Sequence, residues 1–384
     1  MRTRAIALSW LSYATYYLGR KGFSVVKSVI ARDFGLETSA LAWIDTGYLV
    51  AYASGQLPSG LAADRWGARR LLAAGMLGSA LACAAFGASN AAWAFALCFA
   101  INGFAQSTGW PGSTRVMADW TSASDRGRIM GVWSTCYQAG GIAATALATW
   151  LLSHFGWRAA FWVPASILLI VALTVWSFVP DKRGARESGV PPARVLRSPV
   201  LYSYGACYFC IKLIRYSLLF WLPFFLHTAA GFDAVTSGYL STAFEVGGLF
   251  GSMGIGYLSD RSARSRAFVA ALSLVGLAAA MYAYANLSSP SVVLHVAGLA
   301  LVGALLFGPD ALVSGAAAQD AGGPAAAGAA VGLVNGIGSA GALLQSALTV
   351  GVERAYGWHG LLHVFVGLSL VASVCLVPAL RAPR

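Results

Sequence analysis

The stretch "GLAADRWGARR", residues 60–70, returns later in the chain as "GYLSDRSARSR", residues 256–266. Three residue types stand at matching places in both copies, 196 residues apart: Gly60, Asp64 and Arg65, and Gly256, Asp260 and Arg261. Arginines are common in the cytoplasmic loops of membrane proteins, so the arginines alone would need no special explanation. The matched glycine and aspartate are not explained in this way. The pair of stretches therefore indicates an internal duplication.

A second pair of stretches repeats at nearly the same spacing. "GWRAAFW" at 156–162 is answered by "GWHGLLH" at 357–363, an offset of 201. Between the two halves lies the longest polar stretch, "PDKRGARESGVPPARVLRSP", residues 180–199. We predict three parts: a bundle of six helices, a cytoplasmic linker and a second bundle of six helices, over residues 1–180, 181–198 and 199–384.

The composition is that of a membrane protein. Of 384 residues, 58% are hydrophobic and only 10% are charged, whereas soluble domains are about 25% charged. Continuous apolar runs have the length of about 20 residues that a helix needs to cross a bilayer. We predict an all-α protein with twelve membrane helices near 5–31, 41–62, 71–88, 92–114, 129–153, 159–179, 199–226, 236–258, 267–286, 292–315, 325–352 and 359–380.

The net charge of +12 is explained by topology. With the N-terminus inside, 18 of the 26 Lys and Arg fall on the cytoplasmic side and three on the other. This asymmetry follows the positive-inside rule. We therefore expect a multi-pass protein of a bacterial-type inner (plasma) membrane with both termini in the cytoplasm, and no nucleic-acid partner.

Five cations remain, and they fall inside or at the edge of predicted spans: Arg20, Lys21, Lys27, Lys212 and Arg215. A charge at a helix centre costs about 2.5–3.5 kcal/mol on insertion scales, so such residues face an interior cavity. Arg20 lies near the middle of the first span and Arg215 near the middle of the seventh, the matching helix of the second half. Guanidinium groups match phosphate oxygens and stay charged, so the two arginines predict a clamp for an oxyanion.

Further polar residues accompany the two arginines. At helical spacing a tyrosine stripe shares the face of Arg20, and three acids lie inside the spans. Five cations against three acids leave two positive charges, which suits a dianion. The residues expected to line the cavity are Tyr13, Lys27, Tyr216 and Asp310. Asp310 follows Gly308 and Pro309, where the tenth helix is expected to break, and it is an alternative structural partner for Lys212.

The duplicated G-x-x-x-D-R motif resembles the major facilitator superfamily. The resemblance implies two pseudo-symmetric halves of six helices. It also implies that Gly60, Asp64 and Arg65, with Gly256, Asp260 and Arg261, tether helix ends on the cytoplasmic face. Their role would then be in gating and not in substrate contact.

Three further segments resemble the organophosphate:phosphate antiporters: "YYLGRKGF" at 16–23, "NGFAQSTGWPGSTR" at 102–115 and "IRYSLLFWLPFFL" at 214–226. That family carries glycerol-3-phosphate, hexose phosphates and phosphoglycerates. The resemblance implies that Arg20 and Arg215 bind phosphate, that Lys21 follows the family's Arg-Lys pair, and that Glu245 matches a family acid in the eighth helix.

The chain departs from the glycerol-3-phosphate carriers at four positions. Gln56 replaces a lysine, Tyr137 a histidine and Phe220 an aspartate, while Lys212 stands where those carriers have a tyrosine. One cation has thus moved to the second half. We expect the phosphate clamp to be kept and the organic end of the ligand to differ. The accessory substrate site is predicted to comprise Lys21, Tyr16, Lys212, Tyr137, Gln56 and Glu245.

The expected activity is exchange of an organophosphate for inorganic phosphate by alternating access, without catalysis, metal or cofactor. Two alternatives remain open. One is a proton-coupled organic-anion symporter in which Glu245 or Asp310 titrates, and the other is a sugar-phosphate sensor of the same fold. Since each chain contains both halves, a monomer is expected.

Overall fold

A computed structural model describes residues 1–121, 129, 132–133, 135–180, 197–262, 264–287, 291–322 and 327–380, and these residues form helices and connecting turns. The chain divides into two compact units. The first comprises Met1–Glu187 with Gly231–Tyr239, and the second comprises Ser188–Ala230 with Leu240–Arg384. The predicted linker falls mostly on residues 181–196, outside the described residues, so its boundaries stay a prediction.

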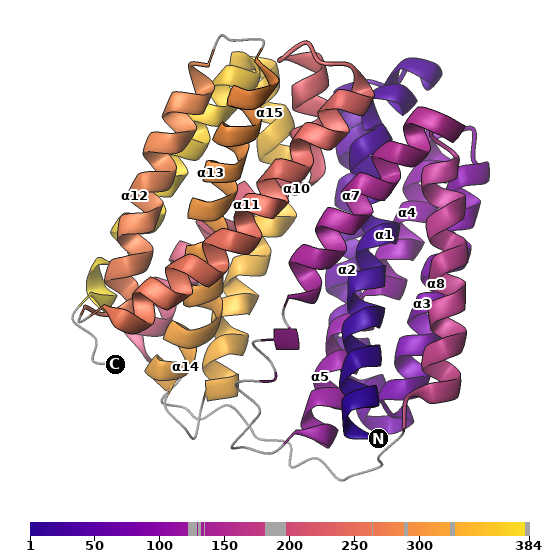
Figure 1. Ribbon diagram of the computed structural model, residues 1–384, viewed down its shortest axis with the longest axis horizontal. Helices are drawn as coiled ribbons and strands as arrows, with labels where there is room; N and C mark the ends of the chain where they lie inside the picture. Colours follow the sequence, from indigo (N-terminus) through magenta and orange to yellow (C-terminus); the bar gives the residue numbers. More distant parts are fainter. Residues whose placement is uncertain are drawn as a thin grey trace. The chain divides into compact units, whose positions relative to one another are not determined.

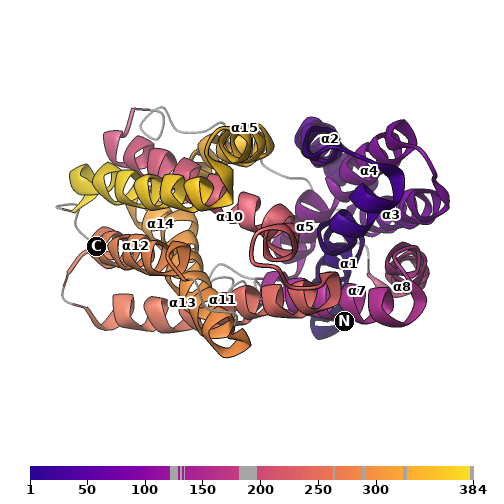
Figure 2. The same ribbon diagram turned by 90° about the horizontal axis from the view of Figure 1, so that it is seen from above.

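The first unit is a helical bundle drawn in indigo to magenta in Figure 1. Helix α1 packs against α7 and α8, α3 against α8, and α2 against α4, which lies beside it in Figure 2. Gly35 ends α1 in the left-handed conformation, with φ of +61°, where its N–H donates to the carbonyl of Ala31. The helices are α1 (Arg2–Phe34), α2 (Thr38–Trp66), α3 (Ala68–Ala88), α4 (Ala92–Gln106), α5 (Gly109–Trp120), α7 (Cys136–Phe155) and α8 (Ala159–Phe178).

The second unit is also a bundle, in which α10 packs along α15, and α12 packs against α13 and α15. Helix α15 bends at Gly357, whose φ of +69° and ψ of 179° are not helical, so two helices meet there. The elements are α10 (Pro199–Thr228), α11 (Ala234–Arg261), α12 (Arg266–Ala285), α13 (Val292–Ala311), a π-helix (Leu312–Ala316), α14 (Ala317–Gly322), α15 (Ala327–Cys375) and a short 3-10 helix (Val377–Ala379). The start of α11, up to Tyr239, belongs to the first unit.

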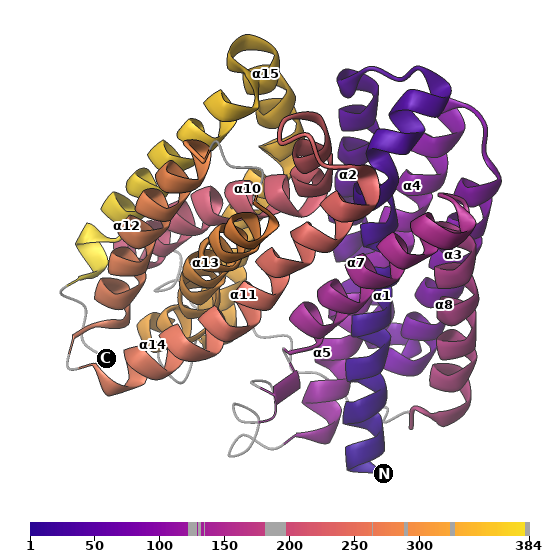
Figure 3. The same cartoon turned by 45° about the horizontal axis from the view of Figure 1, so that its top comes forward.

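The predicted break of the tenth helix is wrong. Helix α13 continues through Pro309 to Ala311, and a π-helix over Leu312–Ala316 then joins it to α14 (Figure 3). Proline removes one backbone N–H and crowds the preceding turn, yet α13 runs through Pro309 without ending there. The irregularity begins two residues after Asp310.

Six helical segments in the described part of the chain are long and apolar enough to span a membrane, judged by length and composition: Ala68–Ala88, Ala159–Phe178, Pro199–Thr228, Arg266–Ala285, Val292–Gly322 and Ala330–Ala379. The predicted fourth span is divided between α4, of 15 residues, and α5. The all-helical class agrees with the prediction, and twelve membrane crossings remain a prediction.

A similar close contact between two helices occurs inside each unit. In the first unit, a Cβ at Gly103 of α4 would collide with the carbonyl oxygen of Tyr48 on α2. In the second unit, a Cβ at Gly303 of α13 would collide in the same way with the carbonyl oxygen of Phe244 on α11. The matching positions lie 200 and 196 residues apart, so the sequence duplication recurs as a repeated backbone contact.

Candidate functional site

Arg20 is held inside the first unit by an amide side chain. It lies on α1 and is 5% exposed. Its Nε donates to Oε1 of Gln106 on α4 at 3.2 Å, and the hydroxyl of Tyr48 on α2 donates to the same oxygen at 2.8 Å. Three helices therefore meet at one acceptor beside the guanidinium.

Gln106 and Asn102 also join α4 to the turn of α1 that precedes Arg20. Nε2 of Gln106 donates to the backbone carbonyl of Tyr16 at 3.0 Å. One helical turn earlier, Asn102 donates to the carbonyl of Gly19 at 2.8 Å. The quoted segment 102–115 contains both residues, but no role was assigned to either from the sequence. Their i,i+4 spacing, which places two amides on one helix face, is the signal that could have found them.

Aromatic rings surround the Arg20 guanidinium. Its Cζ lies 4.9 Å from the ring centroid of Tyr17, 5.3 Å from that of Tyr52 and 5.8 Å from that of Tyr48. Such rings attract a cation through their electron-rich faces and bring no negative charge. Arg20 makes no ion pair within the described residues. No acid therefore neutralises its charge within the described residues.

Two tyrosines expected to contact the substrate or line the cavity are packed in the core instead. Tyr16 is fully buried, with its hydroxyl 2.8 Å from Oγ1 of Thr108. Tyr13 is buried among aromatic rings, with centroid distances of 5.2 Å to Tyr137 and 5.4 Å to Trp133. The helical spacing that places them near the face of Arg20 equally suits a face packed against other helices. Tyr137 is half-buried, and its substrate role stays a prediction.

Lys27, which was expected to line the cavity, is buried in an ion pair. The side chains of Lys27 on α1 and Asp45 on α2 are both 0% exposed, and they form an ion pair of 2.5 Å. Lys27 Nζ also lies 5.0 Å from the ring centroid of Phe23. Burial of two opposite charges requires that they pair, so Lys27 joins α1 to α2 and does not face water.

Arg215 of the second unit has an acidic neighbour. Its Nη1 donates to Oδ2 of Asp310 on α13 at 2.9 Å, and its Cζ lies 4.5 Å from the ring centroid of Phe307, one helical turn before Asp310. Asp310 therefore pairs with Arg215 and not with Lys212. The alternative pairing considered from the sequence is wrong, because Lys212 Nζ instead donates to Oγ of Ser339 on α15 at 3.2 Å.

The other accessory residues lie in the unit that contains their helix. Lys212 and Glu245 are buried and Tyr216 is half-buried in the second unit. Lys21 is buried and Gln56 is half-buried in the first. Their roles toward a substrate stay predictions.

Comparison with known proteins identifies the fold family. A family model described as Major Facilitator Superfamily matches residues 9–346. This chain belongs to that superfamily. The predicted resemblance to the major facilitator superfamily is therefore confirmed. The relatives below concern the narrower resemblance to organophosphate:phosphate antiporters.

Three similar curated proteins cover most of this chain, and two of them are named for a phosphorylated compound. The glucose-6-phosphate exchanger SLC37A2 of Mus musculus is 27% identical over 97% of this chain and 90% of its own length. Putative glycerol-3-phosphate transporter 2 of Arabidopsis thaliana is 29% identical over 98% and 86%. The membrane sensor protein UhpC of Salmonella typhimurium is 26% identical over 100% and 93%. The predicted resemblance to organophosphate:phosphate antiporters is thus confirmed, and the relatives are not enzymes.

Solved structures of superfamily transporters have the same fold. A mutant of the nucleoside transporter NupG aligns with a TM-score of 0.79 at 15% identity, covering 98% of this chain and 99% of that one. A bacterial homolog of the human lysosomal transporter Spinster, inward-facing and occupied, aligns with a TM-score of 0.76 at 15% identity, covering 98% and 95%. These likenesses concern the fold alone.

The second copy of the superfamily motif joins helix ends by charge. Arg266 at the start of α12 pairs with Asp260 of α11 at 2.6 Å and with Asp320 of α14 at 2.7 Å. Arg261 instead lies over the ring of Tyr257, with Cζ 4.4 Å from its centroid. A Cβ at Gly256 would meet no other atom within 4 Å. The side chains of Gly60, Asp64 and Arg65 lie outside the described part of the structure.

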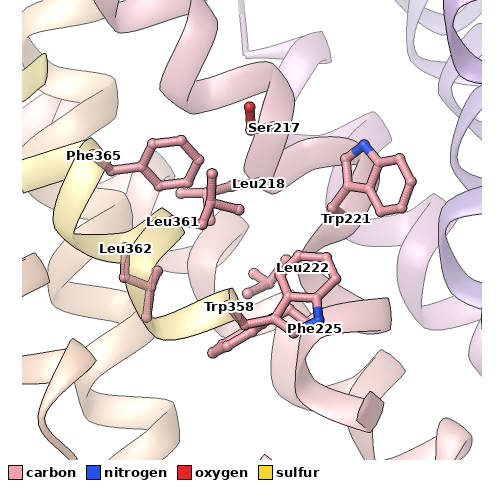
Figure 4. A pocket seen from close by; sticks show the side chains of 9 residues that line it. All are labelled: Ser217, Leu218, Trp221, Leu222, Phe225, Trp358, Leu361, Leu362 and Phe365. Atoms are coloured by element: carbon pink, nitrogen blue, oxygen red, sulfur yellow. The ribbon is translucent and has the colours of Figure 1, made fainter. Parts of the chain in front are cut away.

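A small apolar pocket in the second unit was not predicted. It lies between α10 and the part of α15 that follows Gly357 (Figure 4). The lining residues are Ser217, Leu218, Trp221, Leu222, Phe225, Trp358, Leu361, Leu362 and Phe365. Because none of these side chains is charged, the pocket is unsuited to a phosphate group, and the two arginines remain the candidate site.

Proposed function

We propose that this transporter exchanges an organophosphate for inorganic phosphate by alternating access, with Arg20 and Arg215 binding the phosphoryl group. The observation that carries the proposal is Arg20: a buried guanidinium among neutral tyrosines and an amide, with no acid paired to it within the described residues. The names of the relatives, an exchanger of glucose-6-phosphate and transporters of glycerol-3-phosphate, supply the class of ligand.

The chemistry of arginine favours exchange over one-way transport. An arginine cannot lose its proton in a protein, so an empty site keeps its charge. Enclosing that charge away from water is unfavourable, whereas a bound phosphate dianion neutralises it. The carrier should therefore change conformation readily only when loaded, which couples entry of one phosphate compound to exit of another.

The test is uptake of radiolabelled inorganic phosphate into proteoliposomes that contain either phosphate or buffer alone. We expect uptake only into vesicles preloaded with phosphate. Arg20→Lys and Arg215→Lys should each lose it, because a lysine ammonium cannot reproduce the two-pronged contact of guanidinium with an oxyanion. Arg32→Lys is the matched control, since Arg32 lies on the same helix as Arg20 but is exposed and paired with Asp33.

Absence of phosphate exchange by folded wild-type protein would overturn the proposal. Uptake of an organic anion driven by a pH gradient without internal phosphate would favour the symporter, with Glu245 or Asp310 as its titrating group. The relative named as a sensor favours a second candidate, a sugar-phosphate sensor. Phosphate binding without counterflow would support that reading.

We further propose a monomer in a bacterial-type inner membrane with both termini cytoplasmic.

A further inference from the structure

Asp310 has one carboxylate oxygen that nothing satisfies in the described part of the protein. Oδ2 accepts from Arg215 at 2.9 Å, while Oδ1 is buried and has no hydrogen-bond partner there. The residue as a whole is 7% exposed. A buried polar atom without a partner is costly, and a charged one is more so. Such an atom in a native protein calls for a ligand or another donor.

The surroundings hold this carboxylate in place. Phe307 packs on the Arg215 guanidinium from one turn before Asp310, and Ser314 in the π-helix donates to the backbone carbonyl of Asp310 at 2.6 Å. A guanidinium carries five N–H donors, so contact with one carboxylate does not prevent it from binding a phosphoryl oxygen as well. A ligand held by Arg215 would thus lie beside Asp310.

We propose that Oδ1 of Asp310 accepts a hydroxyl group of the transported organophosphate, which makes the preferred ligand a polyhydroxylated phosphate ester. A phosphorylated carboxylic acid would instead bring a second anion toward Asp310. Like charges a few ångströms apart in a partly buried site repel strongly. Asp310 therefore selects sugar or glycerol phosphates over phosphoglycerates, a choice that the clamp alone does not make.

This inference rests on the proposed function, and its test separates the two. Phosphate exchange in proteoliposomes is inhibited in parallel with glucose-6-phosphate, glycerol-3-phosphate and 3-phosphoglycerate. The quantity measured is the ratio of the inhibitory concentrations of the carboxylated ester and each hydroxylated ester. All three carry the same phosphoryl group, so any general change in phosphate affinity cancels in the ratio.

For the wild type we expect a hydroxylated ester to inhibit at a concentration about tenfold or more below that of 3-phosphoglycerate. Asp310→Asn keeps the shape and removes the charge, so the ratio should fall about tenfold, toward or past equality. Asp310→Glu should keep the preference, because it restores the carboxylate. Glu353→Gln is the matched control: it removes an acid on α15 of the same unit and should leave the ratio unchanged.

The outcomes are distinct. If the wild type does not exchange phosphate, the proposed function fails, and the inference fails with it. If phosphate is exchanged but 3-phosphoglycerate is preferred, or the ratio is the same in wild type and Asp310→Asn, only the inference about Asp310 is overturned. If the Asp310→Asn protein does not fold, the inference is tested by the ratio of inhibitory concentrations in Asp310→Glu and in the wild type.

Discussion

The two arginines of the candidate site stand in matching helices of two related units, yet their surroundings differ in charge. Arg20 is bonded to the neutral amide of Gln106 and faced by tyrosine rings. Arg215 is paired with the carboxylate of Asp310 and faced by Phe307. Within the described residues, the charge of the first is left uncompensated and that of the second is largely compensated.

In the site that we propose, this difference would divide between the two arginines two tasks that a symmetric clamp would share. An uncompensated guanidinium attracts any oxyanion, so Arg20 is suited to supply affinity for phosphate. A guanidinium that already contacts an acid gains less from a new anion, but the acid adds discrimination. The first unit also contains a compensated cation, since Lys27 pairs with Asp45. Whether a buried cation is paired with an acid therefore differs between residues of the same unit.

The largest effect should come from breaking the compensated pair of the first unit. Lys27→Met leaves the Asp45 charge buried without its cation, and we expect a loss of about 3–5 kcal/mol in stability. Adding Asp45→Leu removes the stranded charge and should restore most of that loss. Thermal unfolding in detergent measures both. Equal stability of Lys27→Met and wild type would mean that this pair does not behave as a buried ion pair.

The next effect comes from giving Arg20 the kind of neighbour that Arg215 has. Gln106→Glu places a carboxylate where the amide oxygen now accepts from Arg20. Phosphate affinity should fall on the order of 10- to 100-fold, or about 1.4–2.8 kcal/mol, because an acid already satisfies the guanidinium. The concentration dependence of phosphate exchange reports this change. Unaltered affinity would contradict the assignment of Arg20 as the uncompensated anion site.

A smaller effect is expected at Tyr16, which the sequence placed beside the substrate and the structure places in the core. Tyr16→Phe removes the hydrogen bond to Thr108 and should cost about 0.5–1.5 kcal/mol in unfolding free energy. The substrate concentration for half-maximal exchange should stay as in wild type. A marked rise in that concentration with unchanged stability would return Tyr16 to the binding site.

The smallest effect concerns an exposed acid that pairs with no cation in the described structure. Asp233 precedes α11 and accepts from the backbone N–H groups of Val235 and Thr236. Bonds from the Thr236 hydroxyl and backbone N–H lower the pKa of Asp233 below its ordinary value. Its stabilisation is therefore complete above the ordinary pKa of about 3.9 and is lost as the pH falls through the lower, folded-state pKa.

Asp233→Ala should accordingly cost about 0.5–1 kcal/mol at neutral pH. Most of the difference from wild type should vanish in strong acid. Unfolding temperatures of both proteins across pH 2–7 measure this. A difference that grows on acidification would contradict the capping role.

The sequence predicted well what depends on pattern. Apolar runs predicted helices, and the motif at 256–266 and the segment around Arg20 indicated the superfamily and its relatives. The ion-pair partner of each buried cation was harder to predict, because it depends on which helices pack together. Five cations and three acids could be counted, but pairing Lys27 with Asp45 and Arg215 with Asp310 requires the packing of α1 on α2 and of α10 near α13. Gln106 was quoted only as part of a motif, since an amide carries no charge to draw notice.

Gly103 and Gly303 bring α4 and α13 against the backbone of a neighbouring helix with no side chain between. Two helices ordinarily adjust to each other through changes of rotamer in the layer that separates them, and a seam of bare backbone has no rotamers to change. Each of these two helix pairs therefore has little freedom to adjust at the contact and should move as one stiff piece. The consequence is also evolutionary. Because no side chain fits at either position, inherited variation along these seams can enter only at the flanking residues.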